Sequence, residues 1–243
     1  MAQEYSGSQS SRGRQLGFTT LDEEVQNREL QVEGDIPDWV NGALLRNGPA
    51  KFEDSAKSFN HWFDGMAMLR RFSIRNGRVE YSNKFLESKA YESVKNGEMA
   101  YDEFATDPCR DIFERFFTLF KGPNATDNAN VNIARHADDF VAMTETPIPI
   151  EFDPETLETI GEVEYTESDA VDGDITTAHP HYDFERGETV NYVTEFSRKS
   201  EYKVYTLADS SDEREILGTY GVDEPAYMHS FGMTENYVVL AEF

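Results

Sequence analysis

Short apolar runs separated by turn residues recur along most of this chain, and they constrain the fold more than any other feature. Asn76-Gly77 lies between two such runs, residues 72–74 and 79–81, in the pattern of a β-hairpin with a two-residue turn. The strands expected from the same pattern elsewhere cover residues 148–152, 157–163, 189–193, 202–207 and 237–243. This rhythm predicts an all-β sandwich, barrel or propeller, and no sequence repeat is strict enough to choose among them.

One segment departs from the strand rhythm. Between residues 108 and 121, large apolar side chains recur three or four positions apart, which predicts a helix with an aromatic face. The side chains on that face are Ile112, Phe113, Phe116, Phe117 and Phe120. Two interpretations stay open, namely a helix packed on a sheet and a surface that contacts a membrane or an apolar ligand.

The charge balance argues against nucleic acid as a partner. The chain has 22 Lys and Arg residues against 47 Asp and Glu residues, a formal net charge of -25, which repels a phosphate backbone. The acidic residues are spread along the whole length instead of forming a tail. We therefore expect a strongly solvated surface suited to high salt, where screening weakens the repulsion among these charges, and a halophilic source.

Cysteine usage and the terminal residues indicate the compartment. Cys109 is the only cysteine, so no intrachain disulfide can form and no oxidising compartment is required. Residues 1–16 are polar and contain no apolar signal-peptide core, and no later run approaches the roughly 18 apolar residues of a membrane span. We expect a cytoplasmic protein, with peripheral contact to a membrane as the alternative.

Two histidine segments suggest part of a metal site. Thr-Ala-His-Pro-His at residues 177–181 and Pro-Ala-Tyr-Met-His-Ser-Phe-Gly at residues 225–232 each place a histidine among apolar residues. His179 and His181 share a face of an extended strand, although Pro180 between them marks a strand end. His229 is too far along the chain for a compact metal motif, so only the fold can bring it to His179. Spacing alone leaves each histidine open to a purely structural role.

A larger set of motifs resembles the carotenoid cleavage oxygenase family. The matching segments, in the order in which that family has them, are residues 34–42, 45–49, 61–67, 107–109, 126–132, 144–146, 153–157, 177–181 and 225–237. The resemblance runs from about Phe18 to Phe243. The later segments are most similar to the animal branch, which contains the β-carotene oxygenases and the retinal pigment epithelium isomerohydrolase.

The resemblance implies a seven-bladed β-propeller in which four histidines on the axis bind ferrous iron, with O2 as the co-substrate. By position, His179 and His229 resemble the first and second iron ligands. Glu145 resembles a glutamate that accepts a hydrogen bond from a ligand histidine, here His229. His181 is expected to be a structural neighbour, and the other two histidines, His61 and His136, are expected to be structural as well.

The resemblance also implies the substrate class. Family members cleave a double bond of a carotenoid or apocarotenoid into two carbonyl products, and a related branch isomerises and hydrolyses retinyl esters. The segment 108–121 corresponds to the family's helical cap, so Phe113, Phe116, Phe117 and Phe120 are candidates for a substrate tunnel or for a membrane-facing mouth. A polyene is nearly insoluble in water, so an enzyme that acts on it needs such an apolar surface.

The length of the chain sets the main alternative. Members of the family are about twice as long, and the implied third and fourth histidine ligands are not found here. We therefore expect a disordered N-terminus over residues 1–16 and a partial propeller domain over residues 17–243 that is cut at its C-terminus. The alternative function is a catalytically inactive fragment that binds apolar polyenes or a partner chain.

Overall fold

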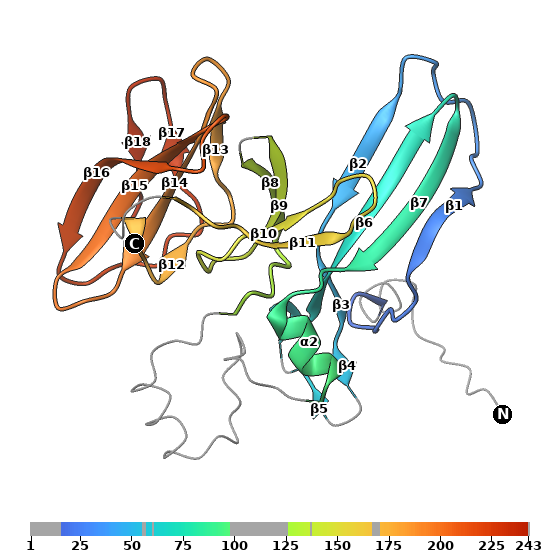
Figure 1. The fold of residues 1–243 in the computed structure, drawn as a ribbon, viewed down its shortest axis with the longest axis horizontal. Helices are drawn as coiled ribbons and strands as arrows, with labels where there is room; N and C mark the ends of the chain where they lie inside the picture. Colours follow the sequence, from blue (N-terminus) through green and yellow to red (C-terminus); the bar gives the residue numbers. More distant parts are fainter. Residues whose placement is uncertain are drawn as a thin grey trace.

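The protein is mostly β-sheet, as the strand rhythm predicts. A computed structural model describes residues 16–54, 57–59, 61–97, 126–136, 138–166 and 171–242. The three larger antiparallel sheets lie side by side in chain order, as Figure 1 shows. The predicted helix over residues 108–121, with its four candidate phenylalanines, lies outside the described residues, as does Cys109.

The first sheet has the strand order β1-β7-β6-β2. Its strands are β1 (Val25–Leu30), β2 (Gly42–Arg46), β6 (Met66–Arg75) and β7 (Arg78–Phe85), and β3 (Pro49–Lys51) also pairs with β6. Asn76 and Gly77 connect β6 to β7 with φ angles of 52° and 73°. Positive φ at both central residues is the signature of a type I′ turn, so the hairpin predicted from Asn-Gly is confirmed.

The second sheet is a four-stranded meander of order β11-β10-β9-β8. Its strands are β8 (Asn132–His136), β9 (Asp139–Met143), β10 (Ile150–Phe152) and β11 (Thr159–Glu162). A turn at residues 153–156 joins the last two strands, between the two strands predicted over residues 148–152 and 157–163. There Asp153 Oδ1 accepts hydrogen bonds from the backbone N–H groups of Glu155 and Thr156, and these bonds hold the turn closed.

The third sheet has an interrupted first strand. It contains β12 (Ile175–Thr176), β13 (His181–Asp183), β14 (Glu188–Glu195), β15 (Ser200–Ala208) and β16 (Arg214–Val222). Both β12 and β13 pair with β14, so residues 177–180 form a break in one edge of the sheet. His179 lies in this break.

Short elements complete the description. They are β4 (Glu53–Asp54), β5 (Lys57–Ser58), the 3-10 helix η1 (Trp62–Asp64), α2 (Lys89–Lys95), β17 (Gly232–Met233) and β18 (Val238–Val239). The strand predicted over residues 237–243 is therefore much shorter than expected. A strand extends only as far as its hydrogen-bonding partner, and within the described residues β18 pairs only with the two residues of β17.

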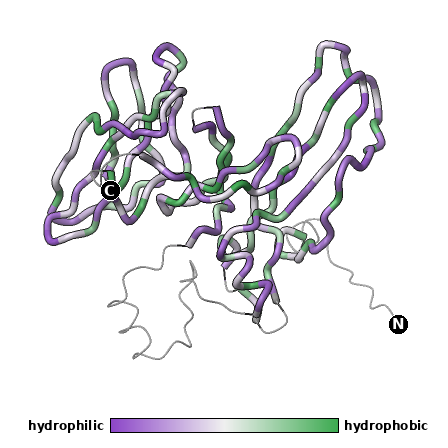
Figure 2. The backbone as a smooth tube through the Cα atoms, in the orientation of Figure 1, coloured by the Kyte–Doolittle hydropathy of each residue, from purple (hydrophilic) through white to green (hydrophobic). Residues whose placement is uncertain are grey.

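The hydrophobic core lies between neighbouring sheets. Leu69 on β6, Ala142 on β9 and Phe152 on β10 belong to one buried cluster, so the first two sheets share a core. Ala178 packs against Val141 and Met143 of β9, which joins the second sheet to the third. Hydrophobic and hydrophilic positions alternate along the strands in Figure 2, as expected where one face of a strand is buried and the other is not.

Candidate metal centre

Buried hydrogen bonds hold the chain on the N-terminal side of His179. Thr177 and Ala178 are fully buried in the break between β12 and β13. The Asn191 side-chain amide on β14 donates to the Thr177 carbonyl over 3.1 Å, and the Asn132 amide at the start of β8 donates to the Ala178 carbonyl over 2.7 Å. These two amides donate to carbonyl groups that make no strand-to-strand hydrogen bond. The break in the sheet edge is therefore stabilised by specific side chains.

The second histidine segment is fixed to the first through one hydroxyl group. Thr177 Oγ1 donates to the His229 carbonyl over 2.5 Å and accepts from the His179 backbone N–H over 3.1 Å. One residue earlier, the Tyr192 hydroxyl donates to the carbonyl of buried Met228. Two segments 50 residues apart in sequence are thus held in register by buried side chains of the third sheet.

The two imidazole rings lie against each other. The ring centroids of His179 and His229 are 4.5 Å apart in an edge-to-face arrangement with an interplanar angle of 65°. Burial lowers the pKa of His179, the neighbouring His229 lowers it further, and Glu145 opposes both effects. Neutral His179 therefore predominates at pH 7, which leaves a ring nitrogen lone pair available to a metal ion.

Glu145 lies behind His229. Its Oε1 atom is 2.8 Å from His229 Nδ1 and accepts a hydrogen bond from the Tyr227 hydroxyl over 2.5 Å. The Glu145 backbone carbonyl accepts from the Thr176 N–H over 2.9 Å, so the carboxylate is anchored to the same sheet break. When Nδ1 carries the proton toward the carboxylate, Nε2 of His229 is the atom with a free lone pair.

Sequence reasoning missed Tyr227. Its hydroxyl shares the Oε1 atom of Glu145 with His229, and burial together with that hydrogen bond raises the pKa of Tyr227. Residues two apart on an extended segment lie on the same side, so the position of Tyr227 before His229 was the available signal. Tyr227 adds a second donor that holds the carboxylate in place.

The remaining histidines have structural contacts. His181 Nε2 lies 2.9 Å from the Phe231 carbonyl and the His181 ring packs edge-on against the Phe231 ring. His61 Nδ1 accepts from the Phe63 N–H at the start of η1. His136 is buried beside the Tyr165 hydroxyl, and burial together with the Arg214 charge lowers the pKa of His136 to about 4.

The geometry brings together two imidazoles and one supporting carboxylate. Within the described residues, no group of three or more His, Cys, Asp or Glu side chains is arranged to hold a metal ion. Also within these residues, no helix is long and apolar enough to cross a membrane.

Comparison with known proteins gives the family. Residues 18–243 match the family described as retinal pigment epithelial membrane protein. The chain belongs to this family. Among curated members, the mitochondrial carotenoid-cleaving dioxygenase of Homo sapiens is 40% identical over 249 residues, which cover 93% of this chain and 42% of that protein. The beta,beta-carotene 15,15'-dioxygenase of Mus musculus is 37% identical over 243 residues, which cover 90% of this chain and 42% of that protein.

Solved structures agree with the family assignment. A variant of the apocarotenoid oxygenase of Synechocystis matches with a TM-score of 0.76 at 26% identity, over 93% of this chain and 48% of that chain. The resemblance to carotenoid cleavage oxygenases is therefore confirmed in both sequence and fold. This chain of the retinal pigment epithelial membrane protein family spans less than half the length of the relatives that it matches.

Proposed function

We propose that this chain supplies two histidine ligands, His179 and His229, to the ferrous iron of a dioxygenase that cleaves a carbon-carbon double bond of a carotenoid or apocarotenoid. The observation that carries the proposal is the contact between the two imidazoles, with Glu145 at the back of one of them. The names of the relatives support the substrate class.

The donor set fits a divalent iron ion. Neutral imidazole is a good ligand for iron, and the lowered pKa of His179 favours the neutral form. The contact with Glu145 directs the Nδ1 proton of His229 toward the carboxylate and leaves Nε2 for the metal. His181 is not assigned this role, because its ring packs against Phe231, whereas the His179 ring packs against His229.

The chain's own residues position the ligands and hold one proton. Glu145 keeps the Nδ1 proton of His229 in a hydrogen bond, and Tyr227 fixes the carboxylate in turn. The Thr177 hydroxyl sets the spacing of the two histidine backbones. When bound, iron supplies the activation of O2 for oxidative cleavage of the polyene into two carbonyl products.

We also propose that the three larger sheets are consecutive blades of a β-propeller. Hydrogen bonds join β2, β8 and the break after β12, since the Asn132 amide on β8 donates to the Ala178 carbonyl and the Asn47 amide after β2 donates to the Asn132 carbonyl. Three antiparallel sheets joined in chain order along one edge are consistent with consecutive blades of a seven-bladed propeller that encloses the metal on its axis. A cytoplasmic location, with peripheral contact to a membrane that holds the substrate, stays a prediction.

Iron binding tests the first half of the proposal. The purified chain is loaded with Fe(II) without oxygen, and metal content is measured after desalting for the wild type, His179→Ala and His229→Ala, with His181→Ala as the matched control. We expect the first two variants to lose iron and the control to keep it. Equal iron in all four proteins would contradict the assignment of the ligands.

Product analysis tests the second half. The chain is joined to the remaining segment of the Homo sapiens relative, so that the hybrid has the length of its family. It is incubated with β-carotene or an apocarotenal in detergent under O2, and carbonyl products are identified by mass spectrometry. Aldehydes that depend on His179 are the expected result. A folded, iron-loaded hybrid that binds the polyene without cleaving it would instead favour the non-catalytic alternative.

A further inference from the structure

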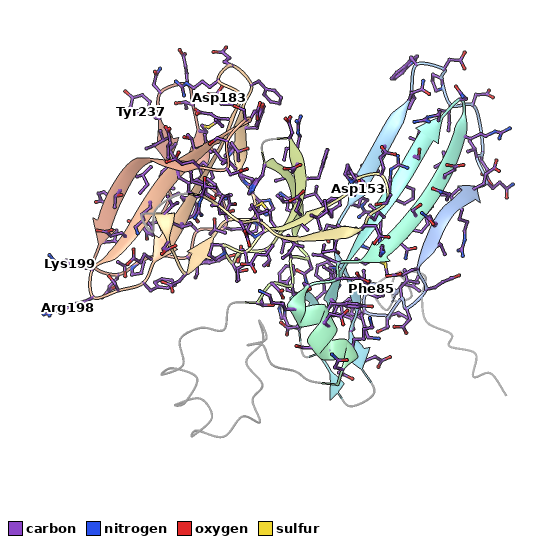
Figure 3. All side chains as sticks on the ribbon, viewed as in Figure 1. Phe85, Asp153, Asp183, Arg198, Lys199 and Tyr237 are labelled. Carbon is purple, nitrogen blue, oxygen red and sulfur yellow. The ribbon has the colours of Figure 1, made fainter. Side chains whose placement is uncertain are left out.

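A hollow of about 700 Å³ lies on the first sheet, lined by different elements from those that hold His179 and His229. Its walls come from β1, β6, β7 and the turn between β10 and β11, whose Asp153 is labelled in Figure 3. The side chains that matter for its chemistry are Arg71, Ser73, Arg75, Arg78, Glu80 and Glu155. Its volume is in the range that holds small molecules in proteins.

The hollow is basic in a chain that is strongly acidic. Its lining has three guanidinium groups against two carboxylates, whereas the whole chain has 22 basic residues against 47 acidic ones. One of those carboxylates, Glu155, is already paired with Arg71 at 2.5 Å. Relative to the whole chain the lining is therefore enriched in positive charge, with Asp153 as a further carboxylate that acts on Arg71.

Two of the arginines face each other across the hairpin, and Glu80 is the next residue on the same face of β7. Arg75 and Arg78 are directly opposite across the end of the β6–β7 hairpin, because the two-residue turn at Asn76 and Gly77 sets that register. Like charges at directly opposed positions of a sheet destabilise it. In the part of the chain that the structure describes, neither guanidinium makes an ion pair. An anion between them would relieve the repulsion.

The third arginine has an unused hydrogen-bonding edge. Arg71 is only 7% exposed, and its Nη2 atom donates to Glu155 Oε2, whereas its Nε atom has no hydrogen-bond partner among the described residues. Nε and Nη2 lie on the same edge of the guanidinium, which is the edge that binds two oxygens of one oxyanion. Glu155 occupies half of that edge, and its side chain is 73% exposed, so it can swing away.

We propose that this hollow binds a phosphate group, either free or as a phosphomonoester, which displaces Glu155 from Arg71 and lies between Arg71 and the Arg75–Arg78 pair. A tetrahedral oxyanion can accept from the Nε and Nη2 edge of Arg71 with two oxygens and from the other guanidiniums with the rest. Ser73 lies between Arg71 and Arg75 on the same face of β6 and contributes a hydroxyl donor.

Titration with inorganic phosphate at constant ionic strength, followed by calorimetry on the whole chain, tests the site. Arg75→Gln/Arg78→Gln removes the opposed pair at an exposed hairpin end, and Arg198→Gln/Lys199→Gln removes two charges from the exposed β14–β15 loop as the matched control (Figure 3). We expect one phosphate per chain, about tenfold weaker binding in the first variant and unchanged binding in the control. Equal weakening in both variants, or no binding by the wild type, would overturn the site.

Glu155→Gln gives an independent test through the direction in which phosphate affinity changes. The substitution removes the competing negative charge and keeps a side-chain acceptor for Arg71. Phosphate is expected to bind this variant several-fold more tightly than it binds the wild type. Weaker binding would show that Glu155 is not displaced and would contradict the proposal.

Cosedimentation with phosphatidylcholine vesicles that contain phosphatidic acid separates the two sources of the phosphate group. A lipid phosphomonoester gives Arg75-dependent and Arg78-dependent cosedimentation, whereas a soluble ligand gives calorimetric binding alone.

Discussion

Removal of the Thr177 hydroxyl is the sharpest test of how the two histidines are held together. Thr177→Val keeps the shape of a fully buried side chain but removes the donor to the His229 carbonyl and the acceptor for the His179 N–H. An unpaired buried polar group costs about 1 to 3 kcal/mol. His229 is 57% exposed at its side chain, so water can reach part of this region and the lower half of the range applies. At about 1 to 2 kcal/mol for each of the two groups, we expect a loss of about 2 to 4 kcal/mol.

Urea denaturation followed by circular dichroism measures this loss. Thr177→Ser keeps the hydroxyl and should recover most of the stability, whereas Thr219→Val, at an exposed position on β16, should change the free energy of unfolding by less than about 0.5 kcal/mol. The metal affinity of Thr177→Val should fall together with its stability, because the His229 backbone loses its anchor. A Thr177→Val protein with wild-type stability and wild-type metal affinity would refute this account.

Three further predictions follow from other contacts. Tyr227→Phe removes one donor to Glu145 Oε1, so the affinity for a divalent metal should fall several-fold with little change in stability, measured by metal titration and urea denaturation. The pKa of His136 is about 4 in the folded protein against 6.5 as its ordinary value, so about 3 kcal/mol of stability, present above pH 6.5, is lost as the pH falls toward 4. His136→Gln should remove this component, which is measured as the difference in unfolding free energy between variant and wild type across that range. Because the net charge is -25, the melting temperature should rise as sodium chloride increases from dilute buffer to about 1 M, and a constant value would contradict the halophilic interpretation.

The sequence predicts local features of this fold well. The Asn76-Gly77 turn and the Asp153 turn are determined by residues next to each other in the chain, so their backbone preferences are visible in the sequence. The break after β12 was not predicted, because it depends on the amides of Asn132 and Asn191, which approach only after the sheets have packed. The length of β18 was overestimated for the same reason, since a strand is limited by its partner.

The candidate site likewise combines features visible in local sequence with features that arise only from packing. His179, His229 and Glu145 were selected because their motifs resemble those of a known family, and the spacing of the histidines alone left a structural role open. The contact between Glu145 and His229 joins residues 84 positions apart, which no local pattern encodes. Tyr227 was missed because a tyrosine in an apolar segment is usually a packing residue, and its role depends on the carboxylate that it meets.

The central claim is that His179 and His229 bind one divalent metal ion together. The most direct measurement is the imidazole nitrogen chemical shifts of the five histidines by NMR, recorded as Zn²⁺ is added as a diamagnetic substitute for Fe(II). We predict that the Nε2 signal of His229 and one ring nitrogen of His179 shift together and saturate at one equivalent, with the other three histidines unchanged. Independent shifts of the two rings, or a first response at His181, would contradict the claim.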